Sequence, residues 1–402
     1  MIPLAPVAFD HHPTFADQQA CTLITSELGF SGDAMVHEAQ RDWSHRPDGT
    51  WSMPGLFDAI APWTSTPDLM FANLETPVAG QDLGYTGFPH FNASPAIIDA
   101  LKVAGVDVVQ TANNHALDRE LVGLVRTLDA VDSRGLSHSG TWATVEDREK
   151  PLLITLPTGL RVGFIAYTFA AEVNILPRGD WSHLAFIAND HFAHDVYALR
   201  HAGADLVVVG VHWGWEYEQW PHEDQVTLGR YLTEDLGVDV VFGTHPHVLE
   251  PAEVRVADAE DRPRDALIMY SLGNMVSFQR NKATDYGVVA TVTVQQCLAD
   301  RRTWLTGFRV MPFWIDVTND AGAIVFRARP APATPALCGP DGYRRGDCDD
   351  LMRVRRRTEA TFPGLVDERV GKPPDPLRVS ALPDASDPRP RPYFTWYAPL
   401  LQ

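Results

Sequence analysis

The stretch GTHPHVLEP, Gly243 to Pro251, ends a run of apolar residues with two histidines one residue apart, His245 and His247. A buried strand has no need of paired imidazoles, whereas a metal ion or an acid–base reaction uses them. Pro246 lies between them and is unfavourable in a regular central strand. We therefore expect a loop here, in which the direction of each imidazole is set locally and both can turn toward one centre.

Outward from this loop, short apolar runs alternate with segments of helical pattern. The segments 95–105, 120–135 and 225–237 carry apolar residues at three- and four-residue spacing and a glycine near the end. Strand alternating with helix predicts a layered α/β fold built around one or two sheets.

Most of the apolar runs end in a polar residue that a buried strand does not need. In open α/β sheets the carboxyl ends of the strands face one crevice, so these residues are expected to converge on one site. Any one of them could be the first polar residue of a loop, but the coincidence of the whole set is improbable. The set is Asp33, Glu75, Asn114 with His115, His212, His245 with His247, and Asn274.

Imidazoles, carboxylates and an amide oxygen form a ligand set for a hard or borderline divalent ion. None of the four cysteines sits in a CxxC pair, which argues against a thiolate zinc site and against a disulfide framework. The closest pair in sequence, Cys338 and Cys348, could bridge a surface loop. Asp285, in the stretch ATDYG, is a weaker catalytic candidate.

The length, charge and apolar patterning of the chain exclude some classes of function. The chain has 402 residues, 45% of them hydrophobic, which is enough for one large domain or two ordinary ones with a buried core. Its net charge of −19 opposes binding to nucleic acid. Neither a signal-peptide pattern nor an apolar run of membrane-spanning length is present, which predicts a soluble cytoplasmic protein without a membrane partner.

Six motifs follow one another in a fixed order and together resemble the bacterial capsule-synthesis CapA family, also called the poly-γ-glutamate biosynthesis family. The resemblance extends over about residues 20–312. The motifs are GDAM (32–35), FANLETPV (71–78), TANNHALD (111–118), VHWGWEY (211–217), GTHPHVLEP (243–251) and YSLGNMV (270–276).

That family resembles the calcineurin-like metallophosphoesterases, so the resemblance implies a four-layer α/β/β/α sandwich with metal at the strand ends. It also implies that His115 occupies the place of a catalytic acid. A phosphoesterase would begin with Asp-x-His, but Ala34 and Met35 follow Asp33, which argues against phosphoester hydrolysis. The implied metal ligands are Asp33, Glu75, Asn114, His212, His245 and His247.

We therefore divide the chain into a segment 1–19, a metal-binding catalytic domain 20–312, and a Pro- and Arg-rich C-terminal extension 313–402 packed on the core. The extension is expected to be irregular apart from one short helix in DDLMRVRRRTEATF. Its end, PYFTWYAPLLQ, is aromatic enough to dock onto the domain or onto a second subunit, as in a homodimer.

The leading functional hypothesis comes from the resemblance and from the missing anchor, since typical family members carry an N-terminal anchor. A soluble relative resembles the metal-dependent peptide epimerase of lasso-peptide biosynthesis. Such an enzyme inverts the Cα of a C-terminal residue, such as Trp, of a ribosomal precursor peptide.

Inversion needs a base and an acid on opposite faces of the Cα centre. We assign these roles to His115 and His247, oriented by Asp118 and Asp33 respectively. The metal would neutralise the substrate carboxylate, and Ca²⁺ is favoured over Mn²⁺ or Zn²⁺.

Trp213, Trp215 and Asn274 are predicted to contact the substrate, the tryptophans as an aromatic pocket. Two alternatives stay open. One is a metal-dependent hydrolase, either a phosphoesterase or a γ-glutamyl amide hydrolase. The other is a non-catalytic factor of capsule or poly-γ-glutamate synthesis that keeps the fold with a vestigial site. Two tightly bound transition ions would favour hydrolysis, and one hard ion would favour the epimerase.

Overall fold

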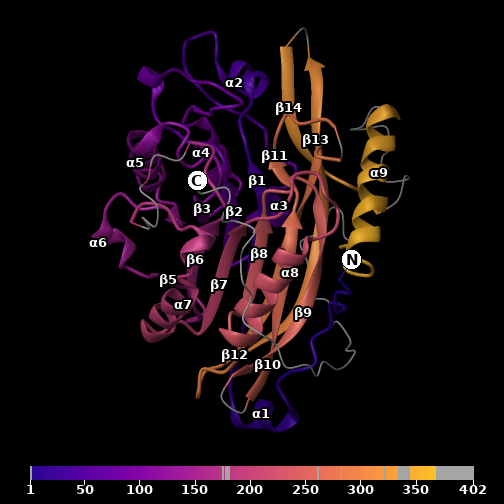
Figure 1. Cartoon of the computed structure of the whole chain (residues 1–402). Coiled ribbons are helices and arrows are strands. Elements are labelled where there is room, and N and C mark those ends of the chain that lie inside the picture. The colour runs from indigo at the N-terminus through magenta and orange to yellow at the C-terminus, as the bar shows by residue number, and fades with distance from the viewer. Residues whose placement is uncertain are drawn as a thin grey trace.

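Two β-sheets pack face to face in the computed structural model, and helices cover their outer faces (Figure 1). The structure describes residues 2–173, 176, 182–259, 262–281, 283–320, 323–333 and 345–367.

The larger sheet holds eight strands, and its parallel half carries the first motifs of the sequence. β1 runs parallel to β2, β2 to β3, and β3 to β4, while β12 to β14 add an antiparallel half. A short strand, β11 (Asn274–Val276), pairs with the end of β1. The order is β14 (Ala323–Pro330), β13 (Thr303–Asp320), β12 (Tyr286–Cys297), β1 (Leu23–Ala34), β2 (Leu69–Leu74), β3 (Val108–Gln110) and β4 (Ser137–Ser139).

The smaller sheet holds six strands, and its centre is parallel from β6 to β10 through β7 and β8. These central strands are buried on both faces, which explains their continuous apolar runs. The order is β5 (Leu152–Thr155), β6 (Arg161–Thr168), β7 (Leu206–His212), β8 (Val240–Thr244), β10 (Arg262–Leu272) and β9 (Leu249–Ala259).

Helices form at each of the three segments where the sequence shows helical spacing. α4 (Ala96–Val103) and α5 (Glu120–Asp132) cover the larger sheet, and α7 (Phe192–His201) and α8 (Glu223–Arg230) cover the smaller one. The other helical elements are α1 (Phe15–Ala20), α2 (Glu38–Ser44), α3 (Ala61–Thr64), η1 (Gln81–Leu83), α6 (Val145–Arg148), η2 (Ile187–Asn189), the π-helix η3 (Tyr231–Asp235) and α9 (Arg345–Thr361).

The main core lies between the sheets, where aromatic rings from both sheets meet. The ring centroids of Phe30 and Phe71 are 5.0 Å apart, and Phe71 lies 5.0 Å from Phe164 of the facing sheet. Two further apolar clusters fill the spaces between each sheet and its helices. The layers therefore run helix, sheet, sheet, helix, which confirms the predicted four-layer α/β/β/α arrangement.

The predicted boundary at residue 312 falls inside β13, so the irregular extension begins later than expected. β13 and β14 continue the larger sheet to Pro330. Pro312 is tolerated because a proline loses only its donor: its carbonyl still accepts a hydrogen bond from the Ala331 N–H at 2.8 Å. Phe313 and Ile315 are fully buried in the cluster behind the sheet.

The short helix expected in the extension is present as α9, which packs beside β13 (Figure 1). Arg353 of this helix pairs with Asp285 at 2.5 Å, and Trp314 Nε1 donates to the same carboxylate at 3.1 Å. Asp285 thus holds the helix against the sheet, and its catalytic role stays a prediction. The aromatic end 392–402 lies outside the described residues.

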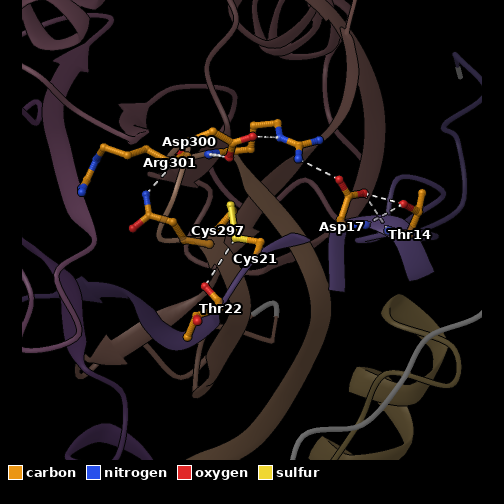
Figure 2. The surroundings of a disulfide bond; sticks show 9 residues. Thr14, Asp17, Cys21, Thr22, Cys297, Asp300 and Arg301 are labelled. Atoms are coloured by element: carbon orange, nitrogen blue, oxygen red, sulfur yellow. Dashed lines mark hydrogen bonds and ion pairs between the residues drawn. A yellow bond between two sulfur atoms is a disulfide. The ribbon is translucent and has the colours of Figure 1, made fainter. Parts of the chain in front are cut away.

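A disulfide joins Cys21 to Cys297, contrary to the prediction from sequence (Figure 2). The cysteines are 276 residues apart in sequence, but the antiparallel pairing of β1 with β12 places Leu23 opposite Cys297. Only the strand register brings the two sulfurs together, so cysteine spacing could not show it. Cys338 of the other proposed bridge lies outside the described residues.

Candidate metal centre

The strand ends of both sheets bring the predicted ligands into one buried cluster. Asp33 at the end of β1 is in register with Asn73 of β2 and Asn274 of β11, and His212 of β7 is in register with Thr244 of β8. Convergence at the carboxyl edge is thus confirmed. At most 5% of any implied ligand is exposed: Asp33, Glu75, Asn114, His212, His245 and His247.

The HPH segment is a loop, as the sequence predicts, and Asp33 organises it. The Asp33 Oδ2 atom accepts from the backbone N–H of His245 at 3.2 Å and lies 3.0 Å from His247 Nδ1. Asn73 Nδ2 donates to the other carboxylate oxygen at 2.8 Å. His245 and His247 have φ values of +99° and +58°, a conformation that non-glycine residues rarely adopt. The strained backbone is maintained by these contacts at the site.

His212 is oriented from both of its ring nitrogens. Nδ1 lies 2.9 Å from Thr244 Oγ1, which fixes the ring plane. Nε2 lies 2.9 Å from Asn114 Oδ1 and 3.4 Å from Glu75 Oε1. The imidazole, the amide oxygen and the carboxylate therefore face one another, as ligands of a shared ion would.

Two buried atoms in this cluster have no hydrogen-bond partner among the described residues, Glu75 Oε1 and His245 Nδ1. Buried polar atoms without partners are costly, and a bound cation would satisfy both. Ligand atoms of two overlapping groups lie within 4.8 Å of one another: Glu75, His245 and His247, and Asp33, Glu75 and His212. The two groups share Glu75, so the donor set fits a divalent metal held around this carboxylate.

The electrostatics of the cluster favour the binding of a cation. Burial, followed by the charge of Asp33, raises the pKa of Glu75 well above its ordinary range. Burial lowers the pKa of His212 to about 3 and that of His245 well below its usual value. Burial acts most strongly on Asp33 and would raise its pKa, but the hydrogen bonds from His247 and Asn73 and the charges of His247 and His212 together outweigh burial, so the pKa falls. His212 and His245 are thus neutral and able to act as ligands, and a cation would favour the ionised form of Glu75.

A second histidine–carboxylate pair lies beside the ligands. His115 Nδ1 is 2.9 Å from Asp118 Oδ2, and the same oxygen accepts from the Phe91 N–H at 2.7 Å. The Phe91 ring packs edge-on against His115 with centroids 4.6 Å apart. The predicted pairing of His115 with Asp118 is therefore confirmed, as is that of His247 with Asp33.

The residues predicted to contact substrate lie in different places. Trp213 is fully buried, stacks on Tyr270 and donates from Nε1 to its carbonyl at 2.9 Å, so its predicted contact with substrate is wrong. Trp215, two residues later, is 53% exposed. Asn274 is buried and donates from Nδ2 to the Thr284 carbonyl at 2.8 Å, which holds the following loop, and its contact with substrate stays a prediction.

Sequence reasoning missed several residues at the edge of the cluster. Asn114 Nδ2 donates to Glu172 Oε1 at 3.3 Å, and the ring of Tyr217 lies 6.3 Å from that of His247. His37 lies close enough that the charges of His247 and His115 act on it, and burial lowers its pKa to about 4. His37 follows Asp33 by four residues, which was the only signal available. Nothing in the local sequence marks Glu172.

Residues 27–279 match the family model described as bacterial capsule synthesis protein PGA_cap, a span longer than half of the chain. The chain belongs to this family. Among curated relatives, PGA biosynthesis protein CapA of Bacillus subtilis is 30% identical over 233 residues, which cover 55% of this chain and 56% of that protein. Capsule biosynthesis protein CapA of Bacillus anthracis is 28% identical over 228 residues, covering 55% and 53%. The chain thus spans about half the length of these relatives.

Among solved structures, the calcineurin-like phosphoesterase YfkN from Bacillus subtilis aligns with a TM-score of 0.41 and 12% identity, over 84% of this chain and 98% of that one. A likeness this distant supports no inference about activity. Among the helices of the described residues, none combines the length and apolarity needed to span a membrane.

Proposed function

We propose that this capsule-synthesis family protein is a metal-dependent hydrolase acting at the cluster around Glu75. The observation that carries the proposal is the pair of ligand groups that share this carboxylate, together with the unpartnered Glu75 Oε1 and His245 Nδ1 atoms. Asp33, Asn114, His212 and His247 would complete the ligand set. When bound, the ion would supply Lewis-acid polarisation of the bond to be cleaved.

The ligand chemistry favours a borderline ion over calcium. Calcium takes oxygen ligands, whereas three of the six residues here offer imidazole nitrogen. Zinc and manganese accept mixed nitrogen and oxygen ligands. We therefore put Zn²⁺ or Mn²⁺ ahead of the Ca²⁺ favoured from the sequence.

His115 is assigned the role of proton donor to the leaving group. The Asp118 carboxylate accepts from Nδ1 and so fixes the tautomer, which leaves Nε2 to hold or release the transferred proton. Phe91 restricts the tilt of the ring. His115 thus has the oriented, nearly dry environment that a general acid requires.

An amide bond is our preferred target. Two relatives are named for PGA or capsule biosynthesis, which supports a γ-glutamyl amide. Met35, where a phosphoesterase would place a histidine ligand, is buried in the core. The relatives do not support the epimerase hypothesis, although each of its two histidines does lie within 3.0 Å of its carboxylate.

The Cys21–Cys297 disulfide supports work in an oxidising compartment, because disulfides are rare in cytosolic proteins. This favours a location outside the cytosol over the cytoplasmic one predicted from sequence.

The test is mass spectrometry of poly-γ-glutamate oligomers and a chromogenic phosphodiester, incubated in deuterium oxide with zinc- or manganese-loaded protein. Chain shortening that is lost with chelator and in His115→Ala, but kept in the exposed-site control His12→Ala, would support amide hydrolysis. Cleavage of the phosphodiester alone would mean that the protein hydrolyses a phosphodiester bond and not an amide bond. Deuterium gained at the Cα of peptide substrates without shortening would restore the epimerase.

A further inference from the structure

A groove of about 620 Å³ opens on the loop that follows β7. Its wall combines two tryptophans with three glutamates, and nothing in the proposed hydrolysis uses them. The lining residues on which the inference rests are Trp215, Glu216, Glu218, Trp220, Glu223 and Gln225.

The groove is connected to the metal centre through Tyr217. The Tyr217 N–H donates to the carbonyl of Pro246, between the two histidines of the HPH loop, at 2.8 Å. The ring centroid of Tyr217 lies 6.3 Å from that of His247. The groove therefore opens on the loop that also contacts the HPH segment of the metal centre.

The charge of the groove is negative. Glu216, Glu218 and Glu223 are all exposed, and His222 is the only residue with a basic side chain among the described residues that line it. The N-terminus of α8 would attract an anion, but Glu223 and Asp224 already occupy its first turn. The net charge of −19 adds to this field.

The two tryptophans of the groove are partly exposed. Trp215 is 53% and Trp220 38% exposed, so each indole presents part of its surface to solvent. An indole face beside carboxylates is the combination that attracts ammonium and guanidinium groups, through the ring quadrupole and direct charge.

A buried carboxyl lies behind the groove. Gln225 Nε2 donates to Glu250 Oε2 at 2.8 Å, and Glu250 Oε1 is fully buried with no hydrogen-bond partner among the described residues. The charge of Glu218 acts on this buried group. The carboxyl of Glu250, with a further acceptor oxygen, therefore contacts the lining residue Gln225.

We propose that this groove binds a cationic part of the substrate, an ammonium or guanidinium group, and holds it beside the metal centre. The assignment to substrate rests on the proposed hydrolytic function, whereas the binding of the cation does not. A pure polyglutamate strand would bring its carboxylates against three glutamates, so among γ-glutamyl amides the groove favours those that also carry a basic portion.

The test uses Nα-acetyl-lysine amide as the probe and Nα-acetyl-norleucine amide, which lacks the ammonium group, as its neutral counterpart. Binding is followed by fluorine NMR of protein labelled with 5-fluorotryptophan, with Trp215→Phe and Trp220→Phe assigning the two signals. We expect the lysine probe to shift both signals and the neutral probe to shift neither. Affinity should fall about tenfold or more in Glu218→Gln/Glu223→Gln, and fall with added salt.

The matched control is Glu146→Gln/Glu149→Gln, which removes the same charge from exposed positions in and just after α6. An equal loss in this control would mean that only the overall field attracts the probe and would overturn the proposal. Equal binding of the norleucine probe, or preferential binding of Nα-acetyl-glutamate amide, would overturn it as well.

The variant Glu75→Gln separates this inference from the proposed function. It should lose metal and hydrolysis but keep binding of the lysine probe. Probe binding without any hydrolysis in the unmodified protein would retain the groove and reject the hydrolase, and hydrolysis without probe binding would do the reverse.

Discussion

The two ends of β1 are held by opposite means. Cys21, just before the strand, is joined covalently to Cys297, and near it Arg302 pairs with Asp17 at 2.7 Å (Figure 2). At the other end Asp33 is held by hydrogen bonds from the HPH loop and from Asn73. One end is closed by a bond, and the other keeps its side chains available.

The difference separates stability from function within a single strand. The disulfide end is closed covalently, and among the described residues no group of possible metal ligands lies there. The metal end tolerates left-handed histidines and the unpartnered Glu75 Oε1, which cost free energy in the absence of a ligand. Such costs are usual where a site must bind something, and the rest of the fold must offset them.

The largest effect is expected at the metal end. Glu75→Gln removes the carboxylate that both ligand groups share, so we expect metal content to fall below half and hydrolysis to fall by about a thousandfold or more. In the presence of chelator the variant should be as stable as the unmodified protein, because the buried carboxyl is gone. Metal analysis, initial rates and urea unfolding measure the three quantities, with the exposed Glu149→Gln as control. Full activity in the variant would remove Glu75 from the centre.

The disulfide end should show the reverse pattern. Cys21→Ser/Cys297→Ser opens a loop of 276 residues, and we expect the free energy of unfolding to fall by about 3–5 kcal/mol. Metal content and the hydrolytic rate per folded molecule should stay the same. Urea unfolding monitored by circular dichroism gives the stability. A coincident loss of metal would show that the two ends are coupled along β1.

A smaller effect is expected for the positioning residue Asp118. Asp118→Asn keeps the acceptor for the Phe91 N–H but no longer fixes the His115 tautomer, so kcat should fall about 10–100-fold with KM and metal content nearly unchanged. The basic limb of the pH–rate profile should also move to lower pH, because His115 acts in its protonated form and loses the stabilising charge of Asp118. Asp129→Asn, exposed on α5, is the control. A loss of metal in place of a shifted pH profile would indicate a merely structural role.

Sequence reasoning reached the metal cluster because its residues terminate apolar runs, and strand ends of parallel sheets must converge. It also reached the HPH loop, since proline and two histidines fit no buried strand. It failed where the outcome depends on register or on the direction of a turn. The Cys21–Cys297 bond follows from the pairing of β1 with β12, which no local pattern encodes.

The tryptophans show the same limit. Trp213 and Trp215 are two residues apart, yet one is a core residue and the other lines the groove, because Gly214 between them turns the chain with φ +85°. Contacts such as that of Glu172 with Asn114 join loops that are 58 residues apart in sequence. The cluster of candidate ligands was thus predictable from sequence, whereas the residues that surround it were not.

The smallest expected effect concerns the pH dependence of stability, which reports whether water reaches His37 at the metal end of β1. The pKa of His37 falls from an ordinary value of 6.5 to about 4, first by burial and then by the charges of His247 and His115. Since the unfolded chain takes up this proton at higher pH than the folded one, His37 costs stability as pH falls below 6.5, by about 1.4 kcal/mol per pH unit down to about 4. His37→Asn should remove that cost, so its loss of stability between pH 6 and pH 5 should be smaller by about this amount. Urea unfolding with chelator, beside the exposed-site control His12→Asn, tests it. An unchanged pH dependence would mean that water reaches His37, and that the metal end of β1 is open to solvent.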